Sequence, residues 1–400
     1  MTILAVFLIN QIRTGGDRDY IELLELLAER GNKVYVILNT YLDYKPEFIS
    51  PIYLAVKYKR HKPPPASFLF KRRIIKEFSK ILNSVSEKKP EFIHIHGDIY
   101  LKSALYLKKK LKIPLFYASR LNDIDKAKTL RKYKAYSRKE YLFSLLYEPV
   151  NRYREKQISR FSDMVCFLNT VDKGRFALRT KRDDENILII PNHIGPPRFT
   201  EETRQKNSSN AVSNIVYVGS PSPQKGLRDL LRASAILKNK GFDLRYHVLG
   251  RKENEEKTLL YIKKLGIEDI VHLEGFVDPF PFFIKCDLFV YPTLYDDFGN
   301  VVTEALHCGC PVLASNTTGP EFILKHRELL FQLGNYNEIA KKIQDCVTDN
   351  EYYQKIRSLC AERALCFEFD WAERFETAMS DYLEKNNSFG AGQEVTRQRS

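Results

Sequence analysis

The 400-residue sequence lacks the segments that mark membrane-spanning and disulfide-stapled proteins. No run of apolar residues approaches the ~20 that a helix needs to cross a bilayer. The opening MTILAVFLIN has no basic leader and no small-residue cleavage site, so we expect a first strand there and not a signal peptide. The 7 cysteines are odd in number and mostly sit among apolar residues, which indicates free core thiols in a reducing cytoplasm.

Several motifs of known chemistry are also missing. No Gly-Lys-Ser/Thr occurs, which excludes a Walker-type phosphate loop, and no Ser-His-Asp order or nucleophile elbow appears. His307, Cys308 and Cys310 are close in sequence, but no second pair of ligands stands at a spacing that zinc would need. We therefore expect these side chains to pack in the core, and we expect no bound metal.

Acidic residues are scarce in the first half of the chain. Residues 1–190 hold 38 Lys+Arg against 21 Asp+Glu, and the whole chain has a formal net charge of +14. Much of the excess lies in 57–76, where basic residues are interleaved with Phe, Leu and Ile, and in 102–139. Such a surface fits contact with an anionic membrane. Two alternatives are a solvated face that keeps the protein soluble, and a nucleic-acid surface, for which no recognisable binding module is present.

What the sequence does contain is an alternation of short apolar runs and amphipathic helices, repeated in two halves. This pattern predicts the α/β class, with two doubly wound Rossmann-like domains that face each other across a cleft. We expect an N-terminal domain at 1–192, a linker rich in Pro, Ser and Asn at 193–212, and a second domain at 213–368. A helix at 369–386 is expected to pack back on the first domain, and 387–400 is expected to be a disordered tail.

Two segments of the first half have ambiguous patterns. Residues 40–70 are expected to form a long connection that contains the rigid run Pro63-Pro64-Pro65. Residues 124–160 have helical spacing and are rich in Tyr, Lys and Arg, with an expected break at Pro149.

The most informative stretch runs from Cys286 to Ile323 and reads CDLFVYPTLYDDFGNVVTEALHCGCPVLASNTTGPEFI. It predicts a strand, an acidic loop, a helix and a second strand, followed by a Gly-Pro turn. The loop leads into a helix N-terminus, where free N–H groups and the helix dipole suit an anion. Asp297 and Glu304, seven positions apart, lie on one side of such a helix. This combination is typical of a nucleotide-sugar site; the alternative is a solvated helix face.

Lys225 stands immediately before Gly226 at the start of another expected helix. An ammonium group and free N–H groups can together neutralise a diphosphate there, and the alternative is a surface lysine. Gly15 and Gly16 lie between the first strand and the first helix, where the chain turns tightly and backbone can approach a ligand. They lack the third glycine of a dinucleotide fingerprint, and a plain turn is the alternative.

Taken in order, these features resemble the group 1 glycosyltransferases (family 4), which are retaining enzymes with the two-domain GT-B fold. The resemblance covers roughly residues 1–385 and is strongest from 214 to 323. It is carried by Gly15-Gly16, His96 after IHI, Pro191-Asn192, VGSPSPQKG (218–226), LEGF (273–276) and the stretch that begins at Cys286.

The resemblance assigns the donor side to the second half of the chain. The family has a Glu-x7-Glu motif in the acidic loop and helix, which we place at Asp297 and Glu304. Glu304 would then accept hydrogen bonds from the ribose hydroxyls, and Asp297 would face the donor sugar. These two acids and Lys225 form the expected catalytic set. The remaining donor contacts would come from Ser220, Glu321 and the backbone N–H groups of Phe298, Gly299, Asn300 and Val301.

This chain departs from the family beside Lys225. The family pairs this lysine with an arginine five residues earlier, where this chain has Ser220. A hydroxyl is a weaker phosphate ligand than a guanidinium group, and Arg251 is a candidate for the missing charge.

The N-terminal half would bind the acceptor. By resemblance, Gly16 approaches the donor phosphate, while Gly15, His96 and Arg120 contact the sugar or the acceptor. Arg120 lies in YASRLND, where the family often has a second histidine. For His96 the alternative is a satisfied core histidine, and His94 is expected to lie deeper on the same side of its strand.

The implied function is transfer of a sugar, with retained configuration, from a nucleotide-diphosphate sugar to a hydroxyl of a glycan or lipid-linked glycan. The acceptor would belong to lipopolysaccharide, capsule or a similar envelope polysaccharide. No cofactor is expected beyond the donor substrate. We expect a cytoplasmic protein with peripheral contact at the inner face of the cell membrane and no nucleic-acid partner. The alternatives are a non-catalytic nucleotide-sugar-binding subunit, and an epimerase or phosphorylase of the same fold.

Overall fold

The chain forms two compact units, as seen in a computed structural model. Unit 1 consists of Met1–Leu121, Arg152–Ile190 and Asp370–Ser400, and unit 2 consists of Asn122–Asn151 and Pro191–Phe369. The structure describes residues 1–8, 15–40, 42–54, 64–97, 101–119, 123–193, 212–251 and 255–397, of which 15, 64–75 and 387–397 are described for the backbone alone. Arg120 and nearly all of the expected linker 193–212 lie outside the described residues.

Unit 1 is built on a parallel sheet of seven strands. In pairing order they are β3 (Ser50–Leu54), β2 (Lys33–Asn39), β1 (Thr2–Phe7), β4 (Phe92–His96), β5 (Leu115–Ala118), β6 (Met164–Phe167) and β7 (Ile187–Ile189). Every neighbouring pair is parallel. The strand order reverses between β1 and β4, which is the switch point of a doubly wound sheet.

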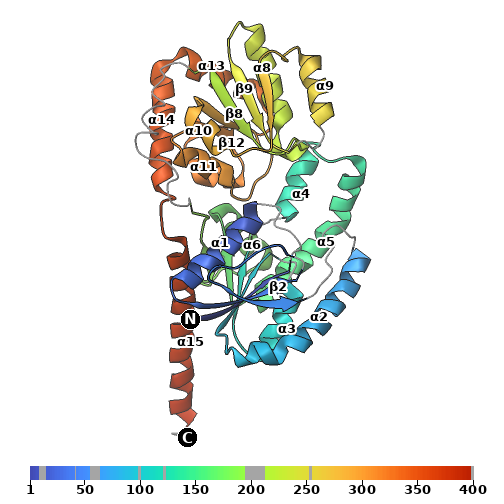
Figure 1. Cartoon of the computed structure of the whole chain (residues 1–400), viewed down its shortest axis with the longest axis vertical. Helices are drawn as coiled ribbons and strands as arrows, with labels where there is room; N and C mark the ends of the chain where they lie inside the picture. The colour runs from blue at the N-terminus through green and yellow to red at the C-terminus, as the bar shows by residue number, and fades with distance from the viewer. Residues whose placement is uncertain are drawn as a thin grey trace. The chain divides into compact units, whose positions relative to one another are not determined.

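Helices flank this sheet (Figure 1). They are α1 (Gly15–Glu29), α2 (Pro64–Glu87), α3 (Leu101–Leu111), α6 (Thr170–Thr180) and α15 (Trp371–Arg397). Charged groups hold α15 beside the end of α1, because Arg30 donates to Asp370 at 2.6 Å and to Glu376 at 2.9 Å. The ring of Phe375 on α15 lies 5.6 Å from that of Phe116 and 5.8 Å from that of His94. The C-terminal helix therefore completes the core of unit 1.

Unit 2 repeats the same strand order. Its six parallel strands pair in the order β10 (Val271–Gly275), β9 (Arg245–Leu249), β8 (Asn214–Val218), β11 (Leu288–Tyr291), β12 (Val312–Ser315) and β13 (Leu330–Phe331). Its helices are α4 (Asp123–Lys132), α8 (Leu227–Asn239), α9 (Glu255–Leu265), α10 (Phe280–Lys285), α11 (Asn300–His307), α12 (Thr318–Leu324), α13 (Tyr336–Thr348) and α14 (Asn350–Leu365), with 3-10 turns η2 (Pro223–Lys225) and η3 (Arg327–Leu329). The helix α5 (Arg138–Phe161) begins in unit 2 and ends in unit 1.

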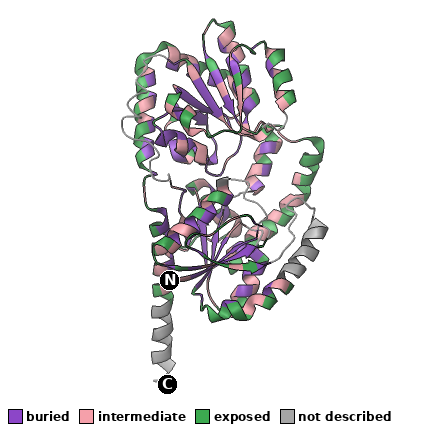
Figure 2. Ribbon diagram, viewed as in Figure 1, coloured by how far each residue is buried: buried purple, intermediate pink, exposed green. Residues whose placement is uncertain are grey.

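The cores of both units lie at the sheets. Figure 2 shows most strand residues as buried, and every residue of β5, β6, β11 and β12 is buried. Strands covered on both faces consist of continuous apolar residues, as the sequence pattern predicted. All of the cysteines are free and all but Cys366 are buried. Within the described residues, no helix has the length and hydropathy to cross a membrane.

The predicted α/β class with two Rossmann-like sheets is confirmed, and several local predictions are wrong. The segment 40–70 is not only a connection, because β3 lies within it as an edge strand, the place in a sheet that tolerates its Pro51. The helical segment does not break at Pro149, which lies inside α5. It divides instead between Lys132 and Arg138, where Lys134 has a left-handed φ of 53°.

Three further differences concern the Gly-Pro turn, the C-terminal helix and a domain boundary. The expected Gly-Pro turn forms the first turn of α12, a position at which proline costs no helix hydrogen bond. The helix α15 continues to Arg397, beyond the expected helix end at 386, and no proline interrupts it. The segment Asn122–Asn151 clusters with unit 2, although the predicted domain boundary placed it in the N-terminal domain.

Candidate active site

The switch point of the unit 2 sheet carries the candidate site. The strands β8 and β11 are parallel neighbours, with Ile215 opposite Leu288 and Val216 opposite Phe289. The strand order reverses between them. Their carboxyl ends therefore open into the crevice in which sheets of this kind bind ligands. The loop with η2 follows β8, and the acidic loop follows β11.

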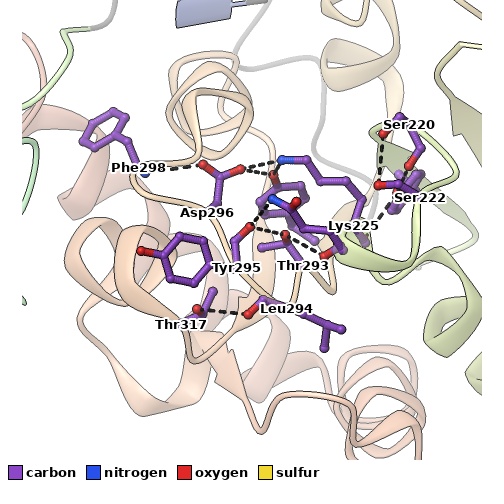
Figure 3. Close-up of polar contacts among 12 residues, drawn as sticks. Ser220, Ser222, Lys225, Thr293, Leu294, Tyr295, Asp296, Phe298 and Thr317 are labelled. Carbon is purple, nitrogen blue, oxygen red and sulfur yellow. Dashed lines mark hydrogen bonds and ion pairs between the residues drawn. The ribbon is translucent and has the colours of Figure 1, made fainter. Parts of the chain in front are cut away.

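Lys225 and Asp296 meet at this position from the two loops (Figure 3). The Lys225 ammonium lies 2.5 Å from Asp296 Oδ2 and donates to the hydroxyl oxygen of Tyr291 at 2.7 Å. The Tyr291 hydroxyl donates to the same Asp296 oxygen at 2.6 Å. The three polar groups form a closed triangle, which fixes the lysine between the ends of β8 and β11.

The electrostatics of the triangle hold Lys225 and Asp296 in their charged forms. Burial opposes the charge of Lys225, but Asp296 and Tyr291 outweigh burial and raise the lysine pKa above its usual value. Burial would also raise the pKa of Asp296, but the Lys225 ammonium and the hydrogen bonds it accepts lower that pKa below its usual value. Burial and the neighbouring Asp296 raise the pKa of Tyr291, so its hydroxyl stays protonated.

An ammonium group has three N–H donors, and the triangle uses two of them. Among the described residues, Lys225 therefore keeps one donor for an oxygen of a bound anion. The site combines a fixed positive charge with a remaining hydrogen-bond donor.

Backbone contacts lock the two loops together. The amide of Leu294 donates to the Gln224 carbonyl at 2.7 Å, and the Gln224 side chain donates to the Tyr295 carbonyl at 3.0 Å (Figure 3). On β8, the Tyr217 hydroxyl donates to the carbonyls of Ser220 and Lys225 at 3.2 and 3.3 Å. The position of Lys225 is thus set by the ends of two strands and not by its own flexible side chain.

Gly226 allows the η2 loop to approach the acidic loop. Its φ is +71°, and a Cβ atom there would lie 1.8 Å from the carbonyl oxygen of Pro292. Only glycine fits this position, because an L side chain would both strain the backbone and overlap Pro292.

Replacing Gly226 with alanine is expected to lower the free energy of unfolding by more than about 3 kcal/mol, since a left-handed φ alone costs about 1–2 kcal/mol and the overlap adds to it. Urea unfolding measures the change. The matched control is Gly241→Ala, because Gly241 has a φ of +85° and nothing within 4 Å of its Cβ position. Equal losses in the two variants would show that the contact with Pro292 does not constrain the loop.

The helix α11 presents its N-terminus beside the acidic loop. Its N-cap is Gly299, with a φ of 91° and no side-chain cap hydrogen bond. Asn300 follows, and its side-chain oxygen accepts a 2.7 Å hydrogen bond from Asn192. Gly319 lets α12 pack against the same turn, since a Cβ atom there would lie 2.2 Å from the Phe298 carbonyl oxygen. Gly299 and Gly319 thus shape the turn before α11, and within it the Phe298 N–H donates to Asp296 Oδ1 at 3.4 Å. The N-terminus of the helix itself suits an anion.

The acid assigned to the first position of the Glu-x7-Glu motif needs a correction. Seven residues separate Asp296 from Glu304, whereas six separate Asp297 from Glu304. The motif position therefore belongs to Asp296, which also contacts Lys225. Asp297 is the next residue of the same loop and is buried, and Glu304 lies on α11.

Of the other donor-side residues predicted from the sequence, all but Gly16 lie in unit 2. The Ser220 hydroxyl donates to the Ser222 hydroxyl at 3.2 Å, so it is held within the η2 loop (Figure 3). Glu321 is exposed on α12. The Arg251 guanidinium lies 5.5 Å from the ring centre of Phe276. Its neighbour Gly250 contacts the Ser220 backbone, with the Gly250 Cβ position 3.6 Å from Ser220 Cα.

The residues predicted for the acceptor side lie in unit 1. Gly15 and Gly16 begin α1, which follows β1, and His96 ends β4. The three residues therefore lie beside the switch point of the unit 1 sheet, between β1 and β4. The ring of His96 packs edge-on against Tyr20 at 4.6 Å. His94 is buried, as expected, and its Nδ1 lies 3.1 Å from the Tyr20 hydroxyl.

Sequence reasoning missed three residues of the site: Asp296, Tyr291 and Tyr217. Asp296 could have been found by counting the seven residues of the motif from Glu304. The two tyrosines lie inside apolar strand patterns, which predict core packing and give no sign of their hydroxyl contacts. His307, Cys308 and Cys310 are buried, and no group of three potential metal-ligating side chains comes together among the described residues.

Two family models match consecutive parts of the chain. The model described as Glycosyltransferase Family 4 matches residues 14–198, and the model described as Glycosyl transferases group 1 matches residues 199–360. The fold defines a protein of the GT-B class, with two Rossmann-like sheets. The chain belongs to the group 1 and family 4 glycosyltransferases.

Relatives of known name are similar over part of their length. The capsular polysaccharide biosynthesis glycosyltransferase CapM of Staphylococcus aureus is 30% identical over 148 residues, which are 36% of this chain and 38% of that protein. The N-acetylgalactosamine-N,N'-diacetylbacillosaminyl-diphospho-undecaprenol 4-alpha-N-acetylgalactosaminyltransferase of Campylobacter jejuni is 26% identical over 233 residues, 57% of this chain and 60% of that protein. The chain thus spans less than two thirds of either relative.

Solved structures share the whole fold at low identity. The sucrose-phosphate synthase of Thermosynechococcus elongatus superposes with a TM-score of 0.73 at 18% identity, covering 98% of this chain and 99% of that chain. Anabaena HepE in complex with UDP-glucose gives a TM-score of 0.67 at 18% identity, covering 97% and 100%. These likenesses establish the fold.

Proposed function

We propose that the chain transfers a sugar from a nucleotide-diphosphate sugar to a hydroxyl of a glycan or lipid-linked glycan in envelope polysaccharide synthesis, with retained configuration. The observation that carries this proposal is the fixed ammonium of Lys225 beside the uncapped N-terminus of α11, both at the switch point of unit 2. The relatives in capsule and lipid-linked glycan synthesis support the class of acceptor. The UDP-glucose bound to HepE supports the class of donor.

The reaction breaks the bond between the anomeric carbon and the leaving phosphate oxygen. A bond forms from the acceptor oxygen on the same face, and the acceptor proton passes to the leaving phosphate. Negative charge grows on the diphosphate as an oxocarbenium-like centre develops. Lys225 and the N–H groups before α11 would stabilise this charge, so no bound metal is needed for it.

The carboxylates have separate roles in this proposal. Glu304 would accept hydrogen bonds from the ribose, and Asp296 would both orient Lys225 and face the donor sugar. Asp297, the next residue, and Glu321 on α12 would contribute to the same donor site. Ser220 would contribute a hydroxyl to the phosphates, and Arg251 would add charge on the same side. Gly15, Gly16, His96 and Arg120 would serve the donor phosphate and the acceptor from unit 1. The protein would work at the cytoplasmic face of the membrane.

A thermal-shift screen with UDP, GDP, ADP and dTDP sugars tests the donor. A ligand present at about 100 times its Kd stabilises the folded state by about 2.7 kcal/mol, so the matching donor is expected to raise Tm by several degrees. The free nucleoside of the same base is the control, because it lacks the diphosphate that Lys225 binds. A screen in which no nucleotide sugar shifts Tm more than its nucleoside would contradict the proposed site.

Product analysis separates transfer from its alternatives. Donor that binds but is neither transferred nor hydrolysed would indicate a non-catalytic binding subunit. Conversion of the donor sugar without an acceptor would indicate an epimerase of the same fold. Transfer with inverted configuration would contradict the retaining step while leaving the donor site intact.

A further inference from the structure

The first half of α5 exposes large apolar side chains. Tyr141, Leu142, Phe143, Leu145, Leu146 and Val150 are all exposed, with Leu142 at 62% and Leu146 at 71% of full exposure. Six such residues within ten positions of one helix exceed the scattered single exposures that are normal on a protein surface. We refer to these six residues as the α5 apolar surface.

Helical spacing gathers this surface on one side. Leu142, Leu146 and Val150 recur every four residues, so they form a stripe along the helix. Phe143 and Leu145 flank the stripe at angles of about 100° or less, because successive residues turn by about 100°. The helix therefore has a continuous apolar face, and α5 is unsuited to full exposure to water.

Positive charge accompanies the apolar face. Lys132, Lys134, Arg138 and Lys139 are exposed around the turn that leads into α5 and on its first turn. Of the two acids in this half of the helix, Glu148 is neutralised by an ion pair, whereas Glu140 is exposed and keeps its charge near Arg138 and Lys139. Glu140 accepts hydrogen bonds from the backbone and side chain of Ser137 at 2.8 and 2.7 Å, and Glu148 pairs with Arg131 at 2.7 Å.

We propose that α5 is a membrane-docking helix that lies in the surface of an anionic bilayer, with the α5 apolar surface inserted and Arg138 and Lys139 at the lipid headgroups. Among the described residues, Arg138 and Lys139 form no ion pair. An apolar helix face beside such basic residues is what an interfacial helix requires. This places the contact on α5 and at the end of the basic stretch 102–139. Nearly all of the basic stretch 57–76 lies outside the residues whose side chains the structure describes.

The charge complementarity selects this occupant over a second copy of the chain. A self-association through α5 would bring the exposed basic residues of two copies near each other, whereas anionic headgroups neutralise them. Docking would hold the enzyme where a lipid-linked acceptor resides. The inference concerns the membrane contact alone, so it is separable from the proposed donor chemistry.

Co-sedimentation of the full chain with vesicles tests the proposal. The wild type is expected to bind vesicles of phosphatidylcholine and phosphatidylglycerol at 50 mM salt, to bind weakly at 500 mM salt, and to bind pure phosphatidylcholine weakly. Leu142→Gln together with Leu146→Gln is expected to reduce binding by about tenfold or more, since each leucine loses its insertion into the apolar layer. Arg138→Ser together with Lys139→Ser is expected to reduce binding by about tenfold or more on anionic vesicles.

Matched controls lie on α9 of the same unit. Leu259 and Leu260 are 51% and 62% exposed, and Lys263 and Lys264 are exposed on the same helix. Leu259→Gln with Leu260→Gln, and Lys263→Ser with Lys264→Ser, are expected to bind vesicles like the wild type. All variants alter exposed side chains, so the fold is expected to remain intact. An unchanged Tm checks the fold, and an unchanged Tm shift with donor checks the donor site.

Three outcomes overturn the proposal. The first is a wild type that does not sediment with anionic vesicles at low salt. The second is a loss in the α5 variants no larger than in the α9 controls. The third is a wild-type dimer in solution that the α5 leucine variant converts to a monomer, with no vesicle binding by either; this result would assign the surface to a second copy of the chain.

Discussion

Lys225→Ala is expected to lower kcat for sugar transfer by about 100- to 1000-fold, with the fold intact. The lysine is the fixed cation at the switch point, and the charge on the leaving diphosphate develops mainly in the transition state. Loss of one preorganised charge or donor of this kind costs about 2.7–4 kcal/mol in the barrier. Steady-state transfer of a radiolabelled sugar measures the effect.

The matched control for this variant is Lys238→Ala. Lys238 also pairs with an aspartate, Asp269, but at the far end of α8 from η2. Both substitutions remove one lysine–aspartate pair, so their difference isolates the position of Lys225. A kcat for Lys225→Ala within about threefold of that of Lys238→Ala would remove the lysine from the chemistry, because threefold is only about 0.7 kcal/mol.

Asp296→Asn is expected to lower kcat by about 30- to 100-fold. It is also expected to shift the alkaline limb of the profile of kcat against pH to a lower pH. In the wild type, Asp296 helps to raise the Lys225 pKa above its usual value, so the ammonium persists as pH rises. Without the carboxylate, Lys225 loses the group that raises its pKa most. Its pKa is then lower than in the wild type, so the active charged form is lost earlier as pH increases. A profile of kcat against pH between about 7 and 10 measures the shift.

The neighbouring Asp297→Asn variant is the control for Asp296→Asn. It removes a carboxylate from the same loop but leaves the pair of Asp296 with Lys225 intact. We expect a smaller loss of kcat and an alkaline limb like that of the wild type. A larger loss in Asp297→Asn than in Asp296→Asn would return the motif position to Asp297 and would refute the spacing argument.

The sequence predicted those parts of the candidate site that a local motif specifies. Lys225 before Gly226, and the acidic loop before α11, follow from a helix N-terminus after a strand, and both were placed correctly on the elements that now carry them. The contact between them could not be predicted. It depends on β8 and β11 being neighbours in the sheet, although some 70 residues separate them in the chain. Tyr291 illustrates the same limit, since its hydroxyl matters only because the lysine arrives from another loop.

The alternation of apolar runs and amphipathic helices was sufficient to predict two Rossmann-like sheets. The strand and the helix that the stretch from Cys286 predicted are present as β11 and α11. The errors fall where a tertiary contact overrides a local signal. β3 is short and contains Pro51, so only its pairing with β2 makes it a strand. α5 continues through Pro149 because one missing hydrogen bond does not end a helix of 24 residues.

The attachment of α15 to unit 1 has a consequence for how the chain folds. Trp371, Phe375 and Met379 are buried in a unit whose strands were all completed before residue 190. During synthesis, the whole of unit 2 must leave the ribosome before these side chains can cover His94 and Phe116. Unit 2 can thus complete its core first, while the apolar side chains of unit 1 that α15 will cover stay exposed. Unit 1 is therefore synthesised first but completes its fold last. A chaperone that protects this protein during synthesis would be needed at unit 1 and not at unit 2.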